Sequence, residues 1–456
     1  MRISELRFFT LPEISHLMAR GDISSVELVN LVLDQINRTD GQVRAYVTIC
    51  RESALAAAEI KDKELRQGKS KQVLHGIPVS FKDNFETEGI RTTCSSKILR
   101  NYIPKKDATA VARLKEAGAI ILGKLNTHEF AQGPITPPTR NPWNLDHIPG
   151  GSSGGSGAAV AATSALVALG SDTGGSIRMP AAFCGVVGFK PTFGLVSKFG
   201  LIPARWTLDH VGPICRRVED AAMLTMLMAG KDPLDLSTVE QPVQDYFGAV
   251  KKGVKGVRLG IPKNHFFTGC DGRISKSVRR AIDDLLDLGC VPVEFHFPDI
   301  SKMLAARLVI DSCESSAFHS RWLRTSASQY QPDVRAALEQ GSKIPATEYI
   351  QAMRYQRVAV EKIVPLFREF DIMITPIELM LASKIGEKVN DDKVMHCTGA
   401  FNFLGLPAVT VPCGFADGLP IGAQMIGNLF DDARVLGIAN AYEKISKHYL
   451  KVPPIS

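Results

Sequence analysis

Two short runs rich in glycine and serine hold hydroxyl groups that could act as nucleophiles. The first run, 150–155, reads Gly-Gly-Ser-Ser-Gly-Gly. A phosphate-binding loop is disfavoured there, because no Lys-Ser or Lys-Thr pair follows in the P-loop position and the GxGxxG spacing is not met. Two interpretations stay open. Gly151, Ser153 and Gly155 fit the G-x-S-x-G pattern of a nucleophile elbow, or the glycines form a turn that places small hydroxyls in a tight site.

The second run, 172–178, reads Asp-Thr-Gly-Gly-Ser-Ile-Arg and places Ser176 behind two glycines. Bare backbone N–H groups in such a run can point at one spot and form an oxyanion hole for a tetrahedral intermediate. Gly-Gly-Ser is a common sequence, so this pattern is weak when it stands alone.

Lys82 follows an apolar run, 77–81, that is typical of a buried strand. A lone lysine in such a place usually extends its ammonium group into solvent. A desolvated lysine instead has a lowered pKa and can accept a proton from a serine hydroxyl.

The elements that must position these residues alternate between helix and strand along most of the chain. The first 70 residues predict three helices: Leu11–Arg20 with Thr10 and Glu13 as a capping box, one capped by Ser24, and Ser53–Gln67. Further helices are predicted at 110–117, 158–169, 275–288, 301–323 and 346–370, and strands at 77–81, 119–122, 257–261, 290–295, 372–375 and 408–411. This alternation is typical of an α/β protein with a layered sheet.

The composition is that of an ordinary globular protein, 45% hydrophobic and 22% charged over 456 residues, with a net charge of +7. Basic residues gather at 251–255 and 276–280, where a solvated surface is the simplest interpretation, and no arginine-rich stripe marks a nucleic-acid site. Nine scattered cysteines indicate neither a zinc site nor disulfides, which fits a reducing cytoplasm. Neither a signal peptide nor a membrane-spanning stretch is expected.

Several segments together closely resemble the amidase signature family, in the family's order and over essentially the whole chain. The segments are His-Gly-Ile-Pro-Val-Ser-Phe-Lys-Asp at 75–83, Pro-Gly-Gly-Ser-Ser-Gly-Gly-Ser at 149–156, Leu-Gly-Ser-Asp-Thr-Gly-Gly-Ser-Ile-Arg at 169–178, Pro-Ala-Ala at 180–182, Gly-Phe-Lys-Pro-Thr at 188–192, Leu-Asp-His-Val-Gly-Pro at 208–213 and Gly-Leu-Pro-Ala-Val-Thr-Val-Pro at 405–412. A signature of this length and order is highly specific, although each piece alone is weak.

The resemblance implies a single α/β/α layered domain over 1–456, in which helices cover both faces of a large mixed β-sheet. Within this domain we expect an N-terminal helical segment at 1–70, a catalytic signature core at 71–230, a variable substrate-pocket region at 231–385, and a C-terminal sheet and helix at 386–456. No metal and no organic cofactor are expected.

The resemblance also implies a Ser-cisSer-Lys triad. Ser176 matches the family's nucleophile, Ser152 the serine on a cis peptide bond, and Lys82 the general base. Neutral Lys82 would take a proton from Ser152, which takes one from Ser176, and the reverse relay would protonate the leaving nitrogen. The expected reaction is hydrolysis of an amide C–N bond through an acyl-serine, to a carboxylic acid and ammonia or an amine.

Residues around the triad are expected to support it. The backbone N–H groups that would form the oxyanion hole are those of Thr173, Gly174, Gly175 and Ser176. Asp172 and Arg178 are expected to form a buried pair that braces this loop. Ser153 is expected to be a hydrogen-bond partner and not a second nucleophile.

Three other candidates are interpreted as structural. His128 and Glu129 begin like a zinc motif, but Gln132 breaks the HExxH pattern. His210 lies in a matched segment, and Cys184 is more typical of a packed core thiol than of a catalyst.

For the substrate, a free-standing amidase acting on a small-molecule amide is preferred. The first alternative is the glutaminase subunit of a tRNA-dependent amidotransferase, but 349–356 reads Tyr-Ile-Gln-Ala-Met-Arg-Tyr-Gln where that subunit has a Gly-Tyr-Tyr-Asp-Ala-Tyr-Tyr-like stretch. A carbamate or aryl-amide hydrolase is a further alternative, and a catalytically silent scaffold is disfavoured by the complete triad. No direct nucleic-acid contact and no membrane are expected, and a homodimer fits the family's habit.

Two departures from the family pattern predict an altered substrate entrance. Segment 129–141 looks shorter than its family counterpart, and Glu378 stands where small residues are usual.

Overall fold

Eleven strands form one mixed sheet in this computed structural model, which describes residues 2–69, 72–242, 244–298, 300–389 and 395–455. The strands are β1 (Tyr46–Ile49), β2 (Pro78–Lys82), β3 (Ile120–Leu125), β4 (Val167–Asp172), β5 (Val187–Lys190), β6 (His210–Cys215), β7 (Arg258–Pro262), β8 (Val291–Phe295), β9 (Ile372–Pro376), β10 (Ala408–Ala416) and β11 (Leu419–Gly427). Their order across the sheet is β1-β3-β2-β4-β6-β5-β10-β11-β9-β7-β8. All four predicted segments contribute strands to this one sheet, and the division of the chain into these segments stays a prediction.

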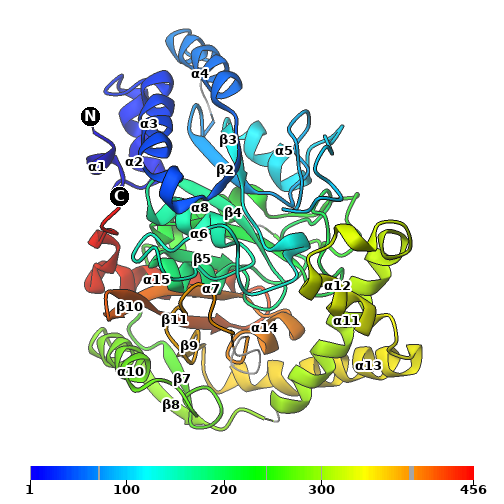
Figure 1. The fold of residues 1–456 in the computed structure, drawn as a ribbon. Helices are drawn as coiled ribbons and strands as arrows, with labels where there is room; N and C mark the ends of the chain where they lie inside the picture. Colours follow the sequence, from blue (N-terminus) through cyan, green and yellow to red (C-terminus); the bar gives the residue numbers. More distant parts are fainter. Residues whose placement is uncertain (1, 70–71, 243, 299, 390–394, 456) are drawn as a thin grey trace.

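Helices lie on both sides of this sheet (Figure 1). The helices are α1 (Ile3–Leu6), α2 (Leu11–Ala19), α3 (Ser25–Val43), α4 (Arg51–Arg66), α5 (Thr109–Glu116), α6 (Gly154–Ala161), α7 (Arg178–Cys184), α8 (Val218–Met228), α9 (Tyr246–Ala249), α10 (Gly272–Asp287), α11 (Ile300–Thr325), α12 (Pro332–Gly341), α13 (Ala346–Ile363), α14 (Gly399–Phe403) and α15 (Asp432–Ser446). Figure 1 shows α11, α12 and α13 grouped together at one side of the molecule.

Alternate residues of a strand point to opposite faces, so each face of the sheet has its own core. In β4, Val167 and Leu169 pack in the core that α3, α8, α10 and α15 share, whereas Ala168 packs with α6 and α7. In β10, Val409 joins the first core and Ala408 packs with α11, α13 and α14. The layered α/β arrangement predicted from the sequence is confirmed.

Parallel pairing of β2 with β4 determines where the site forms. Phe81 of β2 lies opposite Leu169 of β4 in register. Because the strands run in the same direction, their carboxyl ends meet at one edge of the sheet. Lys82 is the last residue of β2 and Asp172 the last residue of β4. Lys82 and the start of the run 172–178 therefore lie at the same edge of the sheet.

The predicted elements are mostly confirmed, including the capping box at Thr10 and the cap at Ser24. The helix predicted at 158–169 is wrong in its second half. Helix α6 ends at Ala161, the chain turns at Thr163 with a φ of +60°, and β4 begins at Val167. The helix predicted to reach Phe370 ends as α13 at Ile363 and continues as a short 3₁₀ turn, since Pro365 has no N–H to donate.

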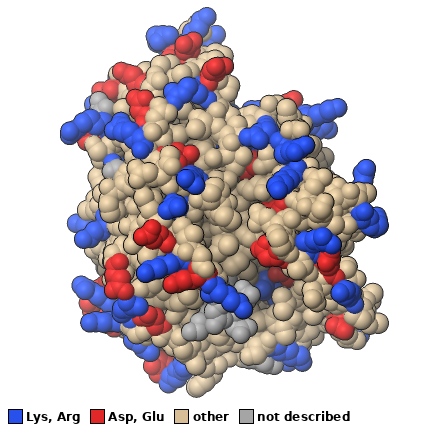
Figure 2. All heavy atoms as spheres, viewed as in Figure 1, with Lys and Arg blue, Asp and Glu red and all other residues tan. Residues whose placement is uncertain are grey.

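Charged residues of both signs are interspersed over the face seen in Figure 2, without a stripe of a single sign. Among the described residues, no helix is both long and apolar enough to cross a membrane.

Candidate active site

Lys82 ends β2 with its side chain fully buried. Its Nζ donates hydrogen bonds to Ser152 Oγ at 2.7 Å and to Ser171 Oγ at 2.8 Å. Burial lowers the pKa of the Lys82 ammonium group to about 7, although the carboxylates of Asp209 and Asp172 act in the opposite direction. A sizeable fraction of Lys82 is therefore neutral near pH 7, which is what a general base requires.

Ser152 and Ser153 lie in the turn that leads into α6. The Gly151–Ser152 peptide bond is cis, as the resemblance implies. Thr136 Oγ1 donates to the carbonyl oxygen of Ser152 at 3.3 Å. The N–H of Ser153 donates to the carbonyl oxygen of Ser176 at 3.2 Å, and this bond ties the turn to the loop that carries the predicted nucleophile.

Ser176 lies between β4 and α7 and is only 5% exposed. Gly175 before it has a φ of +141°, a backbone conformation that side-chain-bearing residues rarely adopt. A Cβ on Gly175 would also stand 2.6 Å from Thr398 Oγ1. Both the backbone and the packing therefore require glycine here.

Backbone N–H groups surround the predicted nucleophile. Those of Thr173, Gly174 and Ser176 have no hydrogen-bond acceptor in the part of the chain that the structure describes. The N–H of Gly175 instead donates to Asp172 Oδ1 at 2.7 Å. Contrary to expectation, Gly175 is thus not available as an oxyanion donor, and the other three amides remain the predicted donors.

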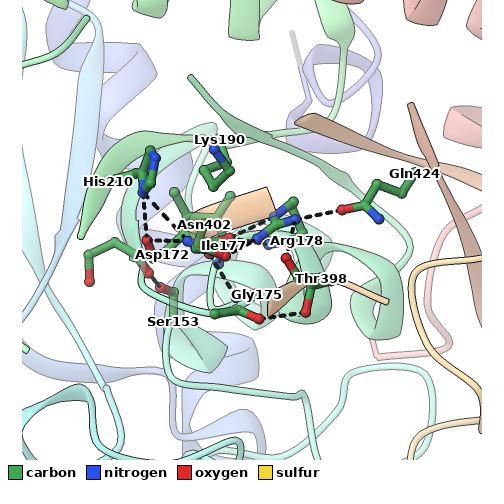
Figure 3. A network of polar contacts seen from close by, with 12 residues as sticks. Ser153, Asp172, Gly175, Ile177, Arg178, Lys190, His210, Thr398, Asn402 and Gln424 are labelled. Carbon is green, nitrogen blue, oxygen red and sulfur yellow. Dashed lines mark hydrogen bonds and ion pairs between the residues drawn. The ribbon is translucent and has the colours of Figure 1, made fainter. Parts of the chain in front are cut away.

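Asp172 and Arg178 form a fully buried ion pair, with 3.0 Å between Nε and Oδ2 (Figure 3). Burial opposes ionisation of Asp172, but the guanidinium of Arg178 outweighs it and holds the pKa of the carboxyl well below its usual range. Asn402 Nδ2 donates to Asp172 Oδ1 at 2.8 Å, and Arg178 Nη1 donates to Gln424 Oε1 at 2.6 Å. Asp172 Oδ2 also accepts the N–H of Ile177 at 3.1 Å, so the ion pair holds the loop on both sides of Ser176.

Arg178→Met is expected to lower the free energy of unfolding by about 3–5 kcal/mol, because it leaves the Asp172 carboxylate buried without a counter-ion. Urea unfolding followed by circular dichroism measures this change. Arg335→Met is the control, since the Arg335–Glu339 pair is about half exposed and such pairs contribute little. Equal losses in the two variants would contradict the bracing role of Arg178.

Ser171 is a contact of the base that the sequence analysis missed. Its Oγ accepts hydrogen bonds from Lys82 Nζ and, at 3.0 Å, from Asn84 Nδ2. Its place inside the matched segment 169–178, one residue before the end of β4, was the available signal. Only the pairing of β2 with β4 brings it beside Lys82.

Ser171→Ala is expected to lower kcat roughly 10-fold with little change in KM, because Lys82 loses one of the two hydroxyls that orient it. Steady-state ammonia release measures both constants. Ser156→Ala is the matched control, since Ser156 is equally buried and its Oγ donates to the carbonyl oxygen of Leu169, at 3.0 Å. An unchanged kcat in Ser171→Ala would show that Ser152 alone orients the base.

The other residues considered as catalytic candidates have contacts that are typical of structural roles. His210 is buried, and its Nδ1 lies 2.8 Å from the carbonyl oxygen of Leu208. Cys184 is buried in the core beside α6, and burial raises the pKa of its thiol. His128 Nε2 lies 3.5 Å from Asp333. No group of three His, Cys, Asp or Glu side chains able to hold a metal ion occurs among the described residues.

The two departures from the family pattern occupy different surroundings. Segment 129–141 packs against the turn at Ser152, since a Cβ on Gly151 would stand 2.6 Å from the carbonyl oxygen of Ile135. Glu378 is buried, and burial raises the pKa of its carboxyl to about 8. It lines a very small cavity behind Phe183 of α7, so it belongs to the interior and not to an entrance as expected.

Comparison with known proteins agrees with this geometry. The model of the Amidase family matches residues 27–436. The A subunit of glutamyl-tRNA(Gln) amidotransferase from Moorella thermoacetica is 41% identical over 99% of each chain. The solved structure of the same subunit from Thermotoga maritima superposes with a TM-score of 0.84 at 35% identity, covering 99% of this chain and 98% of the other.

Other solved structures superpose as well. One comes from a vestigial protein complex that bears on the origins of an s-triazine catabolic enzyme, with a TM-score of 0.91 at 35% identity, over 96% of this chain and 98% of that one. The peptide amidase of Stenotrophomonas maltophilia gives 0.87 at 29% identity, over 98% of each chain. From these matches, and from the hydrogen bond between Lys82 and Ser152 at the end of β2, this chain belongs to the amidase signature family of hydrolases acting on amide C–N bonds.

Proposed function

We propose that this chain releases ammonia from glutamine as the glutaminase subunit of a tRNA-dependent amidotransferase. The observation that carries this proposal is the 41% identity to the A subunit of glutamyl-tRNA(Gln) amidotransferase along 99% of both chains. Further relatives of the same name, from Roseiflexus and Carboxydothermus, are 40% and 39% identical over 99% of this chain. This similarity favours the alternative raised by the sequence analysis over the free-standing amidase that it preferred.

The proposed reaction starts from the contact between Lys82 and Ser152, and its step between Ser152 and Ser176 is the one that the resemblance implies. Neutral Lys82 accepts the proton of Ser152 Oγ across their 2.7 Å hydrogen bond. Ser152 in turn accepts the proton of Ser176, whose oxygen attacks the amide carbon. The free N–H groups of the nucleophile loop stabilise the oxyanion that develops on the amide oxygen. The proton returns through Ser152 to the nitrogen, ammonia leaves, and water hydrolyses the acyl-Ser176 to the free acid.

A free-standing amidase on another small amide, such as a carbamate or an aryl amide, is the second candidate. It is favoured by the departure of 349–356 from the pattern expected of the glutaminase subunit. The TM-scores of 0.91 and 0.87 for the s-triazine-related structure and the peptide amidase, against 0.84 for the amidotransferase structure, point the same way.

The test is ammonia release by the purified chain, with Ser176→Ala as the blank. Glutamine is compared with short aliphatic, aromatic and carbamate amides, first with the chain alone and then with the other amidotransferase subunits of the same organism. Glutamine turnover that rises when those subunits are added supports the proposal. Turnover of a different amide by the chain alone, with none of glutamine under either condition, replaces it with the second candidate.

Treatment with a metal chelator is expected to leave kcat and KM unchanged, because the proposed steps use only serine, lysine and backbone groups. Ammonia release before and after dialysis against the chelator measures this. Lost activity that zinc restores would contradict a metal-free mechanism.

The proposed function also determines which binding partners are expected. The name of the relatives implies further subunits and a tRNA. We propose that the other subunits bind the tRNA, and that this chain makes no direct contact with nucleic acid stays a prediction. A cytoplasmic location and a homodimer also stay predictions.

A further inference from the structure

A second charged cluster lies beside the nucleophile loop and is not used by the mechanism. Arg307 of α11 is only 7% exposed. Its Nη1 lies 3.1 Å from the position that a Cβ on Gly174 would take, and its Nε lies 2.9 Å from the corresponding position on Gly399. The guanidinium therefore lies between the start of α14 and the loop that presents Ser176, two residues beyond Gly174.

The hydrogen bonds of this guanidinium are incomplete. Nη1 donates to Asp311 Oδ2 at 2.9 Å. Within the described part of the chain, Nη2 meets only the sulfur of Met395 at 3.6 Å, and a thioether is a weak acceptor. Nε is buried and has no partner among the described residues. Buried donors are nearly always paired, so the unpaired Nε and the weakly paired Nη2 are two donor positions that an acceptor from outside the protein could use.

Arg307 shares its carboxylate partner. Arg205 also pairs with Asp311, so two guanidinium groups meet at this one carboxylate. The cluster is joined to the catalytic loop. The N–H of Arg205 donates to Asp209 Oδ2 at 2.9 Å, and Asp209 Oδ1 accepts a hydrogen bond from Thr173 Oγ1 at 2.5 Å. The guanidinium of Arg307 is thereby held at a fixed place next to the oxyanion donors.

We propose that Arg307 binds a carboxylate on the acyl part of the substrate, so that the enzyme selects monoamides of small dicarboxylic acids over neutral amides. The two open donor positions, Nε and Nη2, match the two oxygens of a carboxylate, the geometry in which arginine binds anions most strongly. Arg205 and Asp311 are positioning residues that hold the guanidinium in place. This inference rests on the proposed amide hydrolysis, and it includes glutamine without being limited to it.

The experiment compares matched pairs of amides. Glutaramate, the monoamide of glutaric acid, is paired with 5-methylhexanamide, in which two methyl groups replace the carboxylate oxygens. Succinamate is paired in the same way with 4-methylpentanamide. Wild type is expected to prefer each anion by roughly 10- to 100-fold in kcat/KM, mainly through KM, as hydrogen bonds to charged groups imply. Arg307→Gln should abolish most of this preference, and Arg307→Lys should retain part of it.

Arg321→Gln is the matched control, since Arg321 lies on the same helix and is exposed. It should keep the full preference. Equal kcat/KM within each pair for wild type, or an unchanged ratio in Arg307→Gln, overturns the carboxylate site. If Arg307→Gln does not fold, Arg307→Lys and Asp311→Asn are measured in its place. An anion-over-neutral ratio of kcat/KM that equals the wild-type ratio in both variants also overturns the carboxylate site.

A binding measurement separates this inference from the proposed function. Calorimetric titration of Ser176→Ala with glutaramate should give binding that Ser176→Ala/Arg307→Gln lacks, whether or not the wild type turns the compound over. Binding of the anion without any glutamine turnover supports the carboxylate site while the glutamine proposal fails. Glutamine turnover without an effect of Arg307→Gln on the ratios supports the glutamine proposal while the carboxylate site fails.

Discussion

Ser176→Ala is expected to reduce kcat on the order of 10³-fold or more for every amide that the wild type hydrolyses, with little change in thermal stability. Without its Oγ no acyl-enzyme can form, although the oxyanion donors and the substrate contacts remain. The side chain is small and lies two residues before α7, so alanine leaves the surrounding backbone bonds intact. Ammonia release and a thermal unfolding curve, measured on the same preparation, give both quantities.

Ser153→Ala is the control for this loss, because the sequence alone left a nucleophile elbow at Ser153 open. Ser153 Oγ donates to the carbonyl oxygen of Ser171 at 3.1 Å, which engages it in holding β4. Its loss should therefore reduce kcat by roughly 10-fold at most. Full activity in Ser176→Ala combined with an inactive Ser153→Ala would assign the nucleophile to Ser153 and overturn the relay derived above.

Local patterns predicted most of the fold because they act within a few residues. The capping box at Thr10 and the cap at Ser24 are contacts between positions three apart, and the structure confirms both. The run 158–169 failed because alanine and leucine suit a buried helix and a buried strand equally well. In the structure α6 packs its alanines against α7, and the β-branched Val167 begins a strand enclosed on both faces.

The supports of the catalytic loop could not be predicted from local patterns at all. Arg178 donates to Asn402 and Gln424, which lie 224 and 246 positions away in the chain. Neither residue stands out by type or spacing. The motif around Ser176 could be recognised because its members are adjacent in sequence, whereas its supports come from α14 and β11 and meet it only after the sheet has formed.

The pH dependence of kcat/KM should follow the protonation of Lys82. Burial lowers the pKa of its ammonium group to about 7, and only the neutral amine can accept the proton of Ser152. As the pH falls through about 7 the amine becomes protonated and the rate declines, and above this value the rate reaches a plateau. Lys82→Met removes the base and should lower kcat on the order of 10²- to 10⁴-fold. Its residual rate should lack the inflection near pH 7 when kcat/KM is measured from about pH 5 to about pH 10.

Lys124→Met distinguishes the base from any other buried lysine. Lys124 is equally buried on β3, and burial lowers the pKa of its ammonium group to about 8. Its Nζ bonds Thr87 and Thr92, at 3.1 and 2.7 Å, and neither serine of the triad. Its replacement should destabilise the fold. The pH midpoint of kcat/KM, measured on the enzyme that remains folded, should stay unchanged. A midpoint that moves in Lys124→Met and stays fixed in Lys82→Met would mean that the inflection reports Lys124, and the proton relay through Ser152 would then need another base.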